Sequence, residues 1–235
     1  MDHYTTTFGN TVADALPAER ASFIRKTYLH LAGAIIAFVA LEFYLMVSGL
    51  GAEITMTMLG TRWGWLLVLL AFMGVSMLAN WWANSQTSKA MQYLGLGVYT
   101  VAEAIIFAPL LFLAEYRAGS GVIMEAGVVS IGLFLGITAV VFLTRTDFSF
   151  LGPILMIGGF IAIGLIFASI MFGFSLGTVF AFVMVAFAGA SILYETSNVM
   201  HRYNTNQHVA ASLALFASVA LLFWWILRIF MGSRD

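Results

Sequence analysis

The chain has 235 residues and a mass of 25.6 kDa, and 62% of its residues are hydrophobic while only 9% are charged. Soluble domains carry about 25% charged residues, so this composition excludes a soluble fold and predicts a protein embedded in a lipid bilayer. Ten basic and eleven acidic residues give a net charge of −1, which excludes a basic surface for nucleic acid.

The sequence predicts a polar N-terminal tail followed by seven membrane-spanning helices. Residues 1–27 mix acidic and basic side chains, unlike a signal peptide, and are expected to form an exposed tail. Each apolar run after them has about the 20 residues that a helix needs to cross the hydrocarbon layer. The runs are Tyr28–Leu50, Gly64–Ala83, Tyr93–Ala114, Glu125–Leu143, Leu151–Phe172, Leu176–Tyr194 and Val209–Phe230. We therefore expect an all-α integral membrane protein, with its transmembrane domain at residues 28–231 and a short C-terminal tail at residues 232–235.

The distribution of basic residues predicts the orientation of these spans. On the N-terminal side lie Arg20, Arg25, Lys26, Lys89, Arg145 and Arg202, and on the other side lie Arg62, Arg117, Arg228 and Arg234. Arg228 falls in the last turn of the seventh span, and without it the ratio is six to three. Because basic residues are retained in the cytoplasm, we expect the N-terminus in the cytoplasm and the C-terminus outside.

Glu42, Glu103 and Glu195 lie inside or directly next to the predicted spans, where an ionisable side chain must face the bundle interior or water. Glu42 belongs to the first span, Glu103 lies near the middle of the third, and Glu195 lies just past the sixth, in the last turn of its helix. They are either protonatable groups and ion ligands, or carboxyls that burial keeps protonated against a neighbouring helix. Both interpretations stay open at this point.

A polar run, ILYETSN at residues 192–198, ends the helix of the sixth span. The simplest interpretation is a polar helix cap, formed by Thr196, Ser197, Asn198 and His201. His201 and His208 do not have a spacing that would converge with Glu195 on one ion, so we expect neither a metal site nor a cofactor.

Enzyme chemistry is not expected from this sequence. The chain has no cysteine, which excludes thiolate nucleophiles and cysteine-ligated metals. Ser191 follows Gly189 and Ala190 as in a rhomboid protease, but the last span has no histidine that could serve as its base. Lys26 and Lys89 lie at membrane edges, so neither is placed for a retinal Schiff base.

Several strings carry a resemblance to a known family. RTDFSFLG at residues 145–152, ILYETSN at residues 192–198 and the end of the chain at residues 233–235 resemble the Bax inhibitor-1 family, and most closely its bacterial, YccA-like branch. The resemblance implies a bundle in which six helices surround a central last helix. It also implies a protein of the bacterial inner membrane that binds and restrains FtsH, a membrane-bound ATP-dependent protease, through its cytoplasmic N-terminal tail.

The resemblance also suggests an alternative function. Other members of the family are described as pH-sensitive calcium leaks that use two aspartates on the last two helices. Glu195 stands at the first of these positions and Ser218 at the second, so a pair of carboxyls sharing a proton is not available. We expect instead a hydrogen bond between Glu195 and Ser218, and protease modulation in preference to a calcium or proton leak.

Overall fold

The computed structural model of the chain describes residues 11–61, 63–85, 88–119 and 121–233, which form eight helices. They are α1 (Pro17–Val47), α2 (Leu50–Leu59), α3 (Gly64–Ala83), α4 (Lys89–Ala118), α5 (Gly121–Thr144), α6 (Leu151–Phe172), α7 (Gly177–His201) and α8 (His208–Gly232). Seven of these helices, all but α2, are long and apolar enough to cross a membrane. This confirms the predicted all-α architecture with seven spans.

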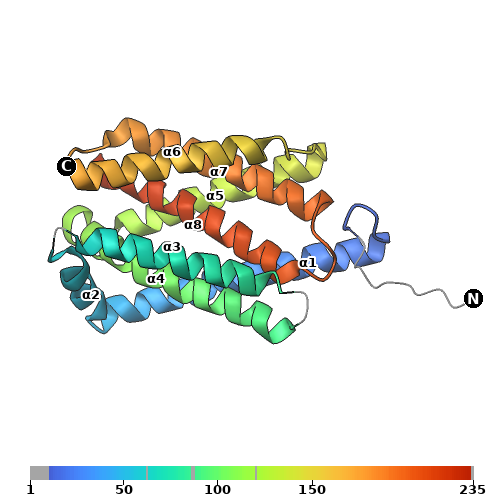
Figure 1. Cartoon of the computed structure of the whole chain (residues 1–235), viewed down its shortest axis with the longest axis horizontal. Coiled ribbons are helices and arrows are strands. Elements are labelled where there is room, and N and C mark those ends of the chain that lie inside the picture. The colour runs from blue at the N-terminus through green and yellow to red at the C-terminus, as the bar shows by residue number, and fades with distance from the viewer. Residues whose placement is uncertain (1–10, 62, 86–87, 120, 234–235) are drawn as a thin grey trace, which may run out of the picture.

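The last helix, α8, runs through the middle of the bundle. In Figure 1 it lies between α5, α6 and α7 on one side and α1, α3 and α4 on the other. It contacts α1, α3, α4, α5 and α7, and 15 of its 25 residues are buried. By contrast, α6 packs on α7 and its buried residue is Ala162. The expected central position of the last helix is confirmed.

Aromatic rings join α1, α4 and α8 near the centre of the bundle. The ring of Phe107 on α4 meets Phe38 of α1 and Trp224 of α8 edge-on, at centroid distances of 5.2 and 4.9 Å. Lipid tails are as apolar as these side chains, so helices associate in a membrane through close packing of this kind. Each such aromatic pair contributes about 0.5–1.5 kcal/mol beyond simple burial.

The first helix begins earlier than the sequence predicts, at Pro17 and not at Tyr28. Hydropathy reports only the part of a helix that meets lipid, whereas Phe23 and Thr27 are already buried against the protein. The ring of Phe23 lies 6.4 Å from that of Tyr203 in the α7–α8 loop. Residues 17–27 are therefore the first turns of α1, where a tail is expected from composition.

Residues before α1 are also attached to the bundle. The N–H of Val12 donates to the carbonyl oxygen of Tyr203 at 2.9 Å, and Thr11 forms an antiparallel bridge with Asn204. The side chain of Val12 is completely buried. We call residues 11–14 the N-terminal latch. Of the expected tail, residues 1–10 lie outside the described residues.

Two further elements differ from the predicted spans. The first span ends at Val47, and the chain then turns through Gly49 at φ 82° into α2, which is too short at about 15 Å to cross a bilayer. The other difference is α7, which continues to His201 and not only to Tyr194. The polar run at residues 192–198 is consequently helical throughout.

Candidate functional site

The polar end of α7 holds Glu195, the carboxyl that the sequence analysis singled out near this membrane surface. Its Oε2 accepts hydrogen bonds from the hydroxyl of Tyr203 at 3.3 Å and from Nδ2 of Asn198 at 3.4 Å. Tyr203 lies in the loop between α7 and α8, where burial, and next the charge of Glu195, raises the pKa of its hydroxyl well above the ordinary value. Tyr203 therefore remains a donor to the carboxyl at neutral pH.

Glu195 does not pair with Ser218. The Oγ of Ser218 lies 2.8 Å from the Oγ of Ser191 and also donates to the carbonyl oxygen of Ala214 at 3.1 Å. Ser191 is one helical turn before Glu195 on α7. The residue of α7 that faces Ser218 therefore lies one turn earlier than the resemblance to the family suggested. The expected Glu195–Ser218 bond is wrong, because Glu195 turns towards Tyr203 and Ser191 takes its place.

Ser197 joins the two strings that carry the family resemblance. Its Oγ accepts from the N–H of Phe148 at 2.9 Å and donates to Oδ1 of Asp147 at 3.3 Å. Residues 145–152 are thereby fixed against residues 192–198, which are about 50 positions away in the chain. Ser197 was expected only to cap its own helix, and its partners instead belong to the α5–α6 loop.

The same loop carries an acidic group with a stabilised charge. Asp147 accepts a hydrogen bond from the N–H of Ser149 at 2.9 Å, and this bond, with the nearby positive charge of Arg202, lowers the pKa of its carboxyl. His201 completes the helix end, with Nδ1 3.0 Å from the carbonyl oxygen of Ser197. Of the four residues expected to cap this helix, His201 is the one whose side chain meets a carbonyl of its last turn.

Three buried hydroxyls meet beside this cluster. Tyr28 of α1 faces Thr138 of α5 and Thr196 of α7. None of the three oxygens has a partner with hydrogen-bond geometry among the described residues. Sequence reasoning missed this trio, because it placed Thr196 in the helix cap and could not align three separate helices.

Glu103 lines a cavity of about 620 Å³ between α3, α4, α6, α7 and α8. Its own fractional exposure is 5%. Most of the lining is apolar or aromatic, including Trp65, Trp224 and Trp225, and the polar side chains that share it include Tyr99 and Arg228. Glu103 is therefore a carboxyl that faces a largely apolar cavity within the predicted membrane layer.

Glu42, Glu103 and Glu195 do not gather in one place. Glu42 on α1 is buried, and neither of its carboxyl oxygens has a hydrogen-bond partner among the described residues. It is not part of the cavity that Glu103 lines, and Glu195 lies in the separate cluster at the end of α7. Across the described chain, no three histidine or acidic side chains are arranged to hold a metal ion.

The chain matches a family model described as inhibitor of apoptosis-promoting Bax1 over residues 20–235. It belongs to the Bax inhibitor-1 family. Members of this family are non-enzymatic membrane proteins, in agreement with the expectation that this chain is not an enzyme. The match covers all seven spans and both strings that meet at Ser197.

Curated relatives of the Bax inhibitor-1 family come from plants, fungi and bacteria. Protein LIFEGUARD 4 of Arabidopsis thaliana is 29% identical over 93% of this chain and 87% of its own length. Bax inhibitor 1 of Schizosaccharomyces pombe is 27% identical over 94% and 81%. The modulator of FtsH protease YccA of Escherichia coli is 30% identical over 73% and 77%. These identities are similar, so they show the family, and membership of the YccA-like branch stays a prediction.

Proposed function

We propose that this Bax inhibitor-1 family protein modulates an FtsH-type ATP-dependent protease in a bacterial inner membrane, with its N-terminus in the cytoplasm. The named FtsH modulator from Escherichia coli, 30% identical over 177 residues, supports this assignment. The strings at residues 145–152 and 192–198 support it as well. In this proposal the protease binds the protein but cannot extract it from the membrane. This mode of action needs no catalytic group.

The N-terminal latch is the observation that carries the proposal. Val12 is completely buried and its N–H is bonded to Tyr203, in the loop that leads directly into α8. A protease that pulls on the N-terminus would apply force to this loop and then to α8, which contacts five other helices. Residues 1–10 would be the segment that the protease binds. The latch and the helical bundle would be the part that resists unfolding and extraction.

Deleting residues 1–10 tests whether the protease binds this segment. This deletion spares the latch, whereas a deletion reaching Arg20 would also remove Val12 and the first turn of α1. We expect capture by the detergent-solubilised protease to be lost while the unfolding temperature of the bundle stays unchanged. Deletion of residues 233–235 at the opposite end is the matched control. Unchanged capture of the protein lacking residues 1–10 would contradict the proposal.

A proton or calcium leak is the second candidate function, and the cavity beside Glu103 favours it. A buried carboxyl in a space of about 620 Å³ provides a site where a cation could pause within the membrane. The cluster at Glu195 adds less support, because Ser218 pairs with Ser191 and supplies no second carboxyl.

Ion flux through reconstituted vesicles tests the leak. If the second function is correct, the purified protein raises calcium or proton flux, and Glu103→Gln removes most of that increase. Glu115→Gln is the matched control, because Glu115 lies on the same helix but is exposed near its end. Flux equal to that of empty vesicles, or an undiminished flux in the Glu103 variant, would contradict this candidate.

A further inference from the structure

A groove separates the outer faces of α1 and α4, with a volume of about 560 Å³. Small residues on both helices form its floor: Gly33, Ala34 and Ala37 on α1 and Gly97 on α4. A methyl group added at Gly33 or Gly97 would meet no atom within 4 Å, so the space above these glycines is open. The walls are formed by apolar side chains such as Leu29, Leu41 and Val101.

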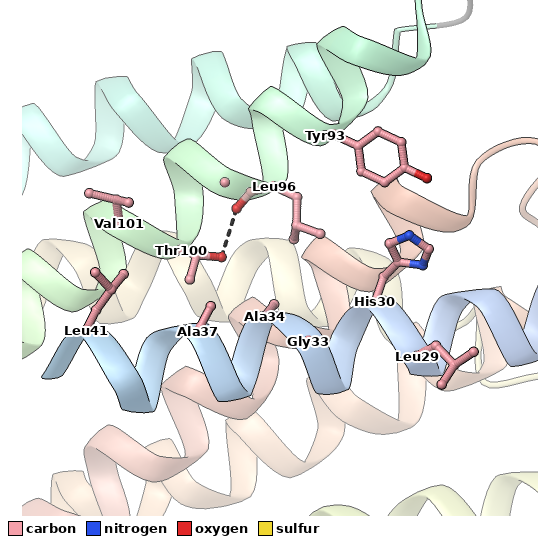
Figure 2. A pocket seen from close by; sticks show the side chains of 11 residues that line it. Leu29, His30, Gly33, Ala34, Ala37, Leu41, Tyr93, Leu96, Thr100 and Val101 are labelled. Atoms are coloured by element: carbon pink, nitrogen blue, oxygen red, sulfur yellow. Dashed lines mark hydrogen bonds between the residues drawn. The ribbon is translucent and has the colours of Figure 1, made fainter. Parts of the chain in front are cut away.

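One end of the groove is polar and the other is apolar. Figure 2 shows His30 and Tyr93 together at one end, and Leu41 and Val101 at the other. The ring centroids of His30 and Tyr93 are 5.5 Å apart. The Nδ1 of His30 lies 2.7 Å from the carbonyl oxygen of Lys26, which leaves Nε2 for another partner.

The polar end gathers four basic groups from three helices. The ring of His30 lies 5.0 Å from that of His208 on α8. His30, Lys26 and Lys89 lie near enough to act electrostatically on His208, and all three are basic. Both lysines are exposed. The two exposed lysines therefore place positive charge at the end of the groove that His30 lines, and His208 is buried next to His30.

The position of this cluster along the helices is that of a membrane interface. Lys89 is the first residue of α4 and His208 the first residue of α8, and both helices are candidate spans. The groove runs from this level towards the middle of the bilayer. Its rim is open, since Leu29 is 63% and Val101 47% exposed. A phosphate at the interface would match the positive charge, and an acyl chain below it would match the apolar lining.

We propose that the α1–α4 groove binds an anionic phospholipid, with its phosphate against Lys26, Lys89 and His30 and one acyl chain along the glycine and alanine floor. Ammonium N–H groups are strong donors to phosphate oxygens. A zwitterionic lipid carries its own cation beside the phosphate, which the basic cluster would repel. The site is independent of protease modulation and of the cavity beside Glu103.

Native mass spectrometry of the full chain, supplied with equal amounts of phosphatidylglycerol and phosphatidylcholine, tests the charge requirement. We expect phosphatidylglycerol to be retained preferentially, and Lys26→Gln and Lys89→Gln each to lower its retention about fivefold. The Lys26→Arg, Lys89→Arg double variant should keep the preference. Arg117→Gln, which removes an exposed cation at the other end of α4, should change nothing. Equal retention of the two lipids, or lysine variants that behave as the wild type, would overturn the proposal.

Filling the groove tests the chain-binding part separately. Gly97→Leu places a side chain in the open space and should reduce phosphatidylglycerol retention at least as much as loss of one lysine. Gly33→Leu fills the same groove from α1 and provides a second variant if the first does not fold. The matched control is Gly74→Leu on α3, where an added side chain also meets nothing. Full lipid retention in a folded groove-filling variant would overturn the assignment of the groove.

Discussion

At the scale of single residues, the contact between Ser191 and Ser218 ties α7 to α8 by a side-chain hydrogen bond. Ser218 uses its hydroxyl twice, as a partner of Ser191 and as a donor to Ala214. Hydrogen bonds between transmembrane helices contribute about 0.6 kcal/mol on average, with a maximum near 1.7. The energetic coupling between these two serines should fall within that range.

A double-mutant cycle on unfolding free energy measures this coupling. We expect Ser191→Ala and Ser218→Ala to be coupled by about 0.6 kcal/mol, because either change alone leaves a partly buried hydroxyl without its partner. The control cycle pairs Glu195→Gln with Ser218→Ala and should show no coupling. Coupling in the second cycle and none in the first would mean that α7 and α8 pack one turn from the register described.

The residues of the site could be predicted only in part from the sequence. Glu195 and Ser197 were singled out, because polar groups at the end of an apolar run are conspicuous. Their partners could not be predicted, because a shift of one turn between α7 and α8 decides which residue faces Ser218. The sequence suggested Glu195 at this position, and the structure has Ser191 there. The hydroxyl trio of Tyr28, Thr138 and Thr196 depends on the rotation of three helices, which hydropathy does not report.

At the scale of helices, the close approach of α3 and α4 depends on one glycine. A side chain at Gly95 would come within 2.5 Å of the carbonyl oxygen of Ala79 and 2.7 Å of the amide nitrogen of Ala83. Both atoms belong to the α3 backbone, so the two helices would have to separate. Gly97, two residues later on α4, meets nothing within 4 Å.

The variants Gly95→Ala and Gly97→Ala should therefore differ in sign. We expect Gly95→Ala to lower the unfolding free energy by about 1–3 kcal/mol, as overpacking does in a close contact. Gly97→Ala should be neutral or stabilising by up to about 1 kcal/mol, because alanine favours the helix and finds open space. Urea or SDS titration of the purified protein gives both values. Equal effects of the two changes would contradict a tight α3–α4 contact.

The limits of the helices show where hydropathy succeeds and where it does not. The bounds Gly64–Ala83 and Leu151–Phe172 agree with the structure, because tryptophans flank one helix and short loops bound the other. The start of α1 at Pro17 and the end of α7 at His201 were not predicted, since those turns pack against protein and loops. The short α2 was missed because its ten residues are too few for a span, and only Leu50 belongs to the first predicted run.

At the scale of the whole molecule, the chain is a bundle built around α8, with its N-terminal latch fastened to the loop that enters α8. Because of this connection, a force on the latch is transmitted to α8, the most buried of the described helices. The side chain of Val12 is completely buried, and burial of a valine contributes about 1.5–3 kcal/mol. An aspartate at this position should release the latch and leave the seven spans in place.

Degradation of the protein in liposomes by a purified FtsH-type protease with ATP is the measurement that tests whether the N-terminal latch resists extraction. Leu16→Asp serves as the control, since Leu16 is 68% exposed and lies outside the latch. If the latch resists extraction, the wild type and the Leu16 variant persist, whereas Val12→Asp, with an unchanged unfolding temperature of the spans, is extracted and degraded several times faster. Equal degradation rates for all three proteins would contradict this role of the latch.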